Sequence, residues 1–319
     1  MSISKIRQKI LEIRELTLLL IIVISSVVLS IVSPYFFTAS NALIILNGMA
    51  LQMVIACGVT IALIGGNIDF SVGSMMGCSA FTCAQLLAHG VPIVLCILGG
   101  LVAGCLLGYL NGLIVTKLRV APIVVTIGTW MAYRGLGIII IGGASIANFP
   151  KEFKNIAQNW KFLGIPFNII VMIVVVAVSI YLLRNVKFFH QAFFIGGNPE
   201  SAKLVGINVD LFTRITYAIN GILAGIAGVL TISRLGSAPA STGQGVEFSI
   251  ITALLIGGVS FNGGAGSIWG ALLGTLMMGI ISNALALYSV SADAQLLIVG
   301  FVLIFAVGID EYTRRKQLR

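Results

Sequence analysis

The run ALIILNGMALQMVIACGVTIALI occupies residues 42–64, and a second apolar run, SVGSMMGCSAFTCAQLLA, occupies residues 71–88. Only the segment GGNIDF, residues 65–70, separates them. A helix that crosses a bilayer needs about 20 predominantly apolar residues. Helices are expected because hydrocarbon offers no partner to unpaired backbone groups, and the runs are too long for barrel strands. The two runs therefore predict helices inside a membrane.

The rest of the chain continues this pattern. Of 319 residues, 58% are hydrophobic and 9% are charged, whereas an ordinary soluble domain has about 25% charged residues. The composition predicts an all-α integral membrane protein with about ten transmembrane helices, some of them broken or re-entrant. The run at 248–260 is too short to cross a bilayer unaided, so it is the candidate for a broken helix. The expected spans are 16–33, 42–64, 71–88, 92–115, 121–141, 167–184, 213–233, 248–260, 267–289 and 293–310.

The basic residues predict the orientation of these helices. The net charge is +9, but no basic face with interleaved aromatic residues suggests nucleic-acid binding. Basic residues gather instead at the ends of apolar runs, as they do in cytoplasmic loops. Ten crossings place both termini and the 185–212 loop in the cytoplasm, and only the 142–166 loop breaks the rule mildly. The cytoplasmic basic residues are Lys5, Arg7, Lys9, Arg14, Lys117, Arg119, Arg184, Lys187, Arg314, Arg315, Lys316 and Arg319.

An internal echo suggests a duplicated unit. Residues 64–74 read IGGNIDFSVGS and residues 256–267 read IGGVSFNGGAGS, each between two apolar runs. Glycine-rich breaks at matching positions of a repeat are typical of a transport path. We therefore predict one membrane domain over residues 1–319 with repeat halves at about 42–141 and 213–310. The other interpretation is a chance likeness of two turns.

Asp69 is an acid surrounded by apolar spans, and two interpretations remain open. Asp69 is either the N-cap of the third span, accepting a hydrogen bond from a backbone N–H, or part of a polar path. A carboxylate inside a bilayer needs a partner, water or a proton. The residues of the candidate substrate path are Asn67, Asp69, Ser71 and Ser74.

The segment 196–207 of the 185–212 loop predicts a short helix with defined ends. Asn198 is a favourable N-cap, and Pro199 suits the first helical position because no N–H is needed there. Glu200 and Lys203 complement the helix dipole, and Gly206 suits a left-handed stop. The helix is either a rigid docking element for another protein or a surface helix without a partner. Its candidate residues are Asn198, Pro199, Glu200, Ala202, Lys203 and Gly206.

Other classes of site find little support. The chain contains no G-x-x-x-x-G-K-[ST] phosphate loop, so ATP binding of that kind is not expected. The histidines His89 and His190 stand apart from other ligands, and the five cysteines form no CxxC pair. We expect neither a catalytic nor a metal site. Arg134 and Glu247 interrupt apolar runs, and each either faces a pathway or pairs near an interface.

A series of motifs recurs along the chain at residues 33–38, 66–74, 111–112, 126–129, 133–135, 196–209, 257–258, 263–264 and 270–274. Through these motifs the chain resembles, almost end to end, the membrane permeases of bacterial ATP-binding-cassette importers for sugars, the ribose-type branch. Phe70 and Asn67 depart from the usual pattern of that branch, and the region around Gly128 and Arg134 is also similar to permeases for autoinducer-2 and rhamnose. Which solute is carried therefore stays open.

The resemblance implies a division of labour in a bacterial inner membrane. Two permeases, identical copies or paralogues, would form the path, and a periplasmic or lipid-anchored solute-binding protein would deliver the cargo. A separate ATPase would bind ATP and Mg²⁺, so this chain would carry no cofactor and would be a transporter subunit without enzymatic activity. The helix near 198–206 would couple the permease to that ATPase. The competing hypothesis is a self-sufficient secondary carrier that uses Asp69 as its coupling acid.

Overall fold

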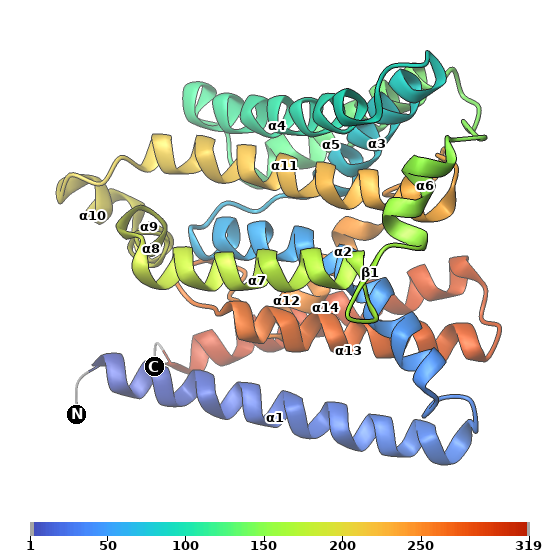
Figure 1. Ribbon diagram of the computed structural model, residues 1–319. Coiled ribbons are helices and arrows are strands. Elements are labelled where there is room, and N and C mark those ends of the chain that lie inside the picture. Colours follow the sequence, from blue (N-terminus) through green and yellow to red (C-terminus); the bar gives the residue numbers. More distant parts are fainter. Residues whose placement is uncertain (1–2, 318–319) are drawn as a thin grey trace.

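Helices make up nearly the whole architecture of the computed structural model (Figure 1). The structure describes residues 3–317, and within them the side chains of residues 15–311 apart from 292, 309 and 310. The predicted all-α membrane fold is confirmed. The basic side chains near the two chain ends lie outside the described set: Lys5, Arg7, Lys9, Arg14, Arg314, Arg315, Lys316 and Arg319.

Each of the predicted apolar runs forms a helix, but the helices differ in length. Within the described residues, 7 helices are long and apolar enough to cross a membrane. They are α1 (Ile3–Val32), α2 (Ala39–Ile64), α4 (Ile93–Leu118), α5 (Pro122–Ile140), α7 (Phe167–Asn185), α11 (Val209–Leu235) and α13 (Ile268–Leu287).

Three apolar segments are shorter. Helix α12 (Val246–Ile256) has 11 residues, as expected of a broken helix. Helix α3 (Val72–Ala88) has 17 residues, which is at the short end of the length that crosses a bilayer. In α14 (Ala292–Gln317) the apolar stretch covers Asp293–Gly308.

The connections add elements that the apolar pattern does not predict. Residues 142–166 include helix α6 (Lys151–Gln158) and the antiparallel strands β1 (Lys161–Phe162) and β2 (Ile165–Pro166). Residues 185–212 include α8 (Lys187–His190), α9 (Ala192–Gly197) and α10 (Pro199–Leu204).

The two groups of connecting elements lie at opposite ends of the bundle (Figure 1). Helices α8, α9 and α10 lie at one end, here called the α10 end, where α1 begins and α14 ends. Helix α6 and the hairpin lie at the other, the α6 end. The two terminal helices thus reach the same end, as an even number of crossings requires.

Helices α2 and α11 form the centre of the bundle. About 61% of the apolar window of each is buried, against 11% for α1 at the edge. Helix α11 lies against α4 through glycines, because a Cβ at Gly104 would collide with the carbonyl of Gly221 and one at Gly108 with that of Tyr217. Small residues of this kind allow close backbone approach where lipid provides no hydrophobic drive.

The two glycine breaks have the same backbone ending. At the end of α2, Gly66 N–H donates to Leu63 O (2.9 Å) and has φ +78°. At the end of α12, Gly258 N–H donates to Leu255 O (3.0 Å) and has φ +82°. Positive φ favours glycine at both positions. The shared ending agrees with a duplicated unit, which stays a prediction.

Candidate functional site

The first break brings Asp69 into the protein interior. Residues 65–71 leave the helical conformation between α2 and α3, and Asp69 is 0% exposed. Its Oδ1 accepts from Ser71 N–H (3.0 Å) and Ser71 Oγ (2.7 Å), and its Oδ2 accepts from Asn220 Nδ2 (3.0 Å). Three donors compensate part of the desolvation of this carboxylate.

This arrangement corrects the N-cap interpretation of Asp69. Ser71 occupies the N-cap position of α3, and Asp69 accepts the N–H of Ser71 itself. An N-cap side chain would instead accept an N–H from within the first turn. The expected backbone hydrogen bond is present, but Asp69 braces the segment that precedes the helix.

The partners of this carboxylate were not predicted from the sequence. Asn220 lies on α11 and Asn111 on α4, both 0% exposed. Asn111 Nδ2 donates to Ser71 Oγ (2.8 Å), and Asn111 Oδ1 accepts from Tyr133 OH (2.8 Å). Polar amides within apolar runs were the available signal, because such residues inside a membrane pair with one another or serve function. The network joins α3, α4, α5 and α11 through one break.

Ser74 lies apart from this network. Its hydroxyl donates to the Trp130 carbonyl of α5 (2.7 Å). Of the four candidate path residues, the structure thus joins Asp69 and Ser71 directly, while Ser74 and Asn67 have other surroundings.

Asn67 lines a pocket of about 330 Å³ at the α10 end. Its Oδ1 accepts from Thr213 Oγ1 (3.3 Å), while its buried Nδ2 has no hydrogen-bond partner. The pocket also receives Pro199 and Lys203 of α10. Candidate path residues and candidate coupling residues therefore meet in one place. The pocket is lined by Gly65, Gly66, Asn67, Val115, Thr116, Arg119, Pro122, Ile195, Gly196, Pro199, Lys203, Val209, Asp210, Thr213 and Asn262.

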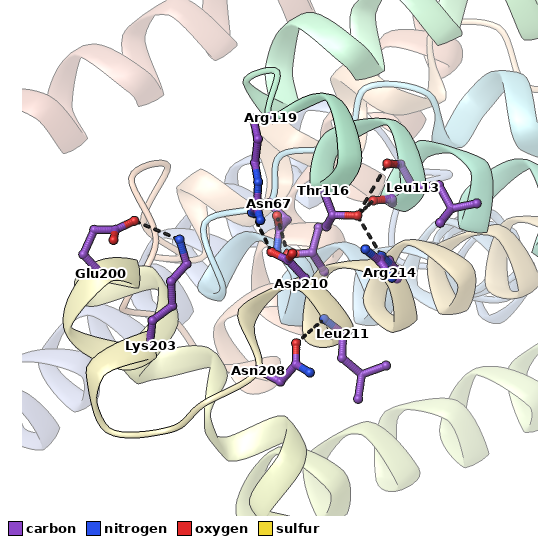
Figure 2. Close-up of polar contacts among 12 residues, drawn as sticks. Asn67, Leu113, Thr116, Arg119, Glu200, Lys203, Asn208, Asp210, Leu211 and Arg214 are labelled. Carbon is purple, nitrogen blue, oxygen red and sulfur yellow. Dashed lines mark hydrogen bonds and ion pairs between the residues drawn. The ribbon is translucent and has the colours of Figure 1, made fainter.

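Polar contacts join α4 and α11 across this pocket (Figure 2). Arg119 and Asp210 form an ion pair at 2.8 Å, and Arg214 Nε donates to Thr116 Oγ1 (2.7 Å). The Arg119 side chain is 66% exposed, and exposed ion pairs contribute little to stability. These contacts therefore orient the two helix ends more than they hold them together.

Helix α10 has the predicted ends. Asn198 Oδ1 accepts from Ser201 N–H (3.0 Å), Pro199 is the first helical residue, and Gly206 has φ +85°. Glu200 pairs with Lys203 at 2.9 Å (Figure 2). Ala202 is buried at 3% exposed, so one side of the helix is anchored in the protein. The predicted short helix with defined ends is confirmed, and its docking to another protein stays a prediction.

Gly196, which precedes α10 in the chain, contacts both glycine breaks. Gly264 N–H of the second break donates to Ile64 O of the first (2.7 Å). Gly196 lies against this contact, since a Cβ there would collide with Ile64 O and Gly264 N. Movement of the α9–α10 segment would thus act on both breaks through backbone contact.

The described residues contain no cluster of three or more His, Cys, Asp or Glu that could hold a metal ion. The cysteines are free, and Cys57, Cys78, Cys83 and Cys96 are buried. The polar groups of the site are mostly amides and hydroxyls, which suit transient hydrogen bonds to a solute.

Comparisons with known proteins identify the family. Residues 41–307 match the family model described as "Branched-chain amino acid transport system / permease component". The chain is 34% identical to a ribose import permease of Bacillus subtilis, with 89% of this chain and 88% of the relative covered. It is 33% identical to an autoinducer 2 import system permease of Yersinia pseudotuberculosis (93% and 84% covered).

A third relative is a D-allose transport system permease of Escherichia coli, at 32% identity with 92% of this chain and 90% of the relative covered. The search of solved structures found no match. The expectation of a multi-pass membrane transport subunit is confirmed. The chain belongs to the family of transport-system permease components.

Proposed function

We propose that this chain is the permease subunit of an ATP-binding-cassette importer for a sugar or a sugar-like solute. The relatives named for ribose, autoinducer 2 and allose support such a cargo. The neutral amides and hydroxyls near the first break also favour a neutral, hydroxyl-rich solute. Selectivity would lie mainly in a periplasmic or lipid-anchored solute-binding protein.

A separate ATPase would supply the energy and bind ATP with Mg²⁺. The observation that carries this proposal is the placement of α10: Pro199 and Lys203 line the same pocket as Asn67, and Gly196 lies against both breaks. A short helix with defined ends can move as a rigid body when the ATPase pair closes, and tilt the spans around it. The α10 end would face the cytoplasm of a bacterium, and a second permease copy or paralogue would complete the path.

Reconstitution in liposomes tests this assignment. We expect uptake of tritiated D-ribose or D-allose only when the ATPase, its ATP and the binding protein accompany this chain. Uptake by the chain alone, driven by a proton or sodium gradient, would establish the secondary carrier instead and refute the importer.

Charge reversal on α10 tests the docking role. Glu200 has a side chain 78% exposed, so Glu200→Arg should cost the fold only about 0.2–0.5 kcal/mol through its lost pair with Lys203. We expect loss of ATPase co-purification and at least about a tenfold drop in uptake, because an interface charge is reversed.

Glu152→Arg is the matched control, since Glu152 also lies in the first turn of a short exposed helix but at the α6 end. It should leave ATPase binding unchanged. Normal ATPase binding and uptake in Glu200→Arg would contradict docking at α10.

A further inference from the structure

Glu247 carries a buried carboxylate that belongs neither to the Asp69 network nor to the pocket at the α10 end. It lies in the first turn of α12 and is 1% exposed. The Trp130 indole and the N–H groups of Gly245 and Glu247 lie close to it, but neither carboxylate oxygen has a partner in hydrogen-bonding geometry. An acid within a membrane domain is costly, and an unpaired one is a candidate for function.

Helices α3 and α12 both begin beside this carboxylate. A Cβ at Gly73 would collide with Glu247 Oε2 and with the carbonyl of Gly243. The carboxylate of Glu247 therefore rests on the first turn of α3, beside the beginning of its own helix. Helix N-termini carry partial positive charge, which stabilises the carboxylate. Both oxygens are enclosed by protein in this conformation, so a solute would reach them only after the surrounding helices move apart.

The nearby arginine is already occupied. Arg134 of α5 donates to Thr242 O (2.7 Å), Ala240 O (2.8 Å) and Gln244 Oε1 (3.3 Å). It thus holds the non-helical segment that leads into α12. Arg134 and Glu247 form no ion pair. The guanidinium therefore holds the segment before α12 in position and leaves the carboxylate without an ion-pair partner.

Three aromatic rings gather beside Glu247. Phe248 meets Trp130 of α5 at a centroid distance of 5.9 Å and an interplanar angle of 80°. It also meets Phe70 of the first break at 5.8 Å. All three rings are partly exposed, so part of each ring is accessible from outside this chain. They bring the first break, α5 and α12 together at one point.

We propose that Glu247 and the rings of Phe70, Trp130 and Phe248 form the place in the path where a neutral, hydroxyl-rich solute binds transiently. The proposal rests on the proposed import function and gives it a cargo-contacting site. Two carboxylate oxygens accept hydroxyl hydrogens, and aromatic faces pack against the C–H face of a sugar ring. A metal cation is a poorer fit, because a single carboxylate supplies too few oxygen ligands.

The test uses the complete importer, with its ATPase and binding protein, in liposomes. Initial uptake of tritiated D-ribose and D-allose is measured first for the wild type, and a failure there would refute sugar import itself. With wild-type uptake established, we expect Glu247→Gln and Trp130→Ala to lower uptake at least about tenfold, and Trp130→Phe to retain most of it. The ratio between the two sugars should shift, because a group that touches cargo discriminates between a pentose and a hexose.

Thr252→Val is the matched control on α12, since the buried Thr252 hydroxyl donates only to the Phe248 carbonyl of its own helix (2.7 Å). It should change neither rate nor ratio. Complex assembly and basal ATP hydrolysis are measured in parallel. If Glu247→Gln prevents assembly, Trp130→Ala and Phe248→Ala decide the question. Uptake within twofold of wild type with an unchanged sugar ratio in the assembled variants would overturn the proposal.

Discussion

Asp69 shows how single residues make a carboxylate acceptable inside an apolar bundle. Its oxygens receive a hydroxyl, a backbone N–H and an amide. Asn220 has a further property, because its own Oδ1 lacks a hydrogen-bond partner. The Asn220 amide can therefore flip, exchanging its oxygen and nitrogen, without breaking a hydrogen bond to any other residue. Because of this flip, substitutions of Asp69 can test whether its role is structural.

The pair Asp69→Asn and Asp69→Leu separates structure from proton coupling. In Asp69→Asn, the new amide donates to a reversed Asn220, so we expect less than about 1 kcal/mol of lost stability and near-normal uptake. Asp69→Leu strands the donors of Ser71 and Asn220, at a cost on the order of 3 kcal/mol. Thermal unfolding of the purified importer measures the difference.

Measurements of uptake distinguish a bracing role of Asp69 from proton or sodium coupling, which the stability measurement alone does not. A carrier that moves protons or sodium through Asp69 would lose transport in Asp69→Asn while remaining folded. Such a loss would speak against the bracing role derived from the hydrogen bonds.

At the scale of elements, the two breaks and the α9–α10 segment act as one backbone assembly. Gly196, Gly263 and Gly66 approach so closely that a Cβ at Gly263 would lie 3.0 Å from Gly66 and 3.1 Å from Gly196. Backbone contacts of this kind transmit displacement without flexible side chains in between. The short helix is therefore connected to places where α2 and α12 end.

Adjacent glycines offer a direct test of this connection. Gly196→Ala places a methyl group against Ile64 O and Gly264 N, whereas Gly197 has nothing within 4 Å of an added Cβ. We expect Gly196→Ala to reduce uptake at least about tenfold and to alter the coupling of ATP hydrolysis to transport, because the added methyl group would push the two breaks away from residue 196. Gly197→Ala should behave as wild type. Equal activities of the two variants would remove the mechanical role assigned to Gly196.

At the scale of the whole molecule, the arrangement divides the bundle into two chemically different ends. The α10 end carries the pocket with Arg119, Lys203 and Asp210. The α6 end carries an amphipathic helix and a hairpin. If the proposed orientation holds, the first faces the ATPase and the second faces the solute-binding protein.

Cysteine labelling in whole cells measures this orientation. The native cysteines give little background, since four are buried and Cys105 is only partly exposed. We expect Asn159→Cys at the α6 end to react with a membrane-impermeant maleimide after the outer membrane is made permeable. Ser201→Cys on α10 should react only after the inner membrane is opened. The reverse pattern would invert the proposed topology.

The fold class, the position of the apolar helices and the ends of α10 could be predicted from the residue pattern alone. These depend on local chemistry: hydropathy over a helix length, an Asn–Pro start and a glycine stop. The glycine breaks were also visible, because they interrupt apolar runs in a repeated pattern.

The contacts between polar residues of different helices became visible only in the folded bundle. Asp69 and Asn220 lie far apart in the chain, as do Glu247 and Gly73, and nothing in the spacing predicts these pairs. The α2–α11 core and the close approach of glycine backbones bring them together. Local pattern specifies helices, whereas the contacts between distant helices depend on the packing of the entire bundle.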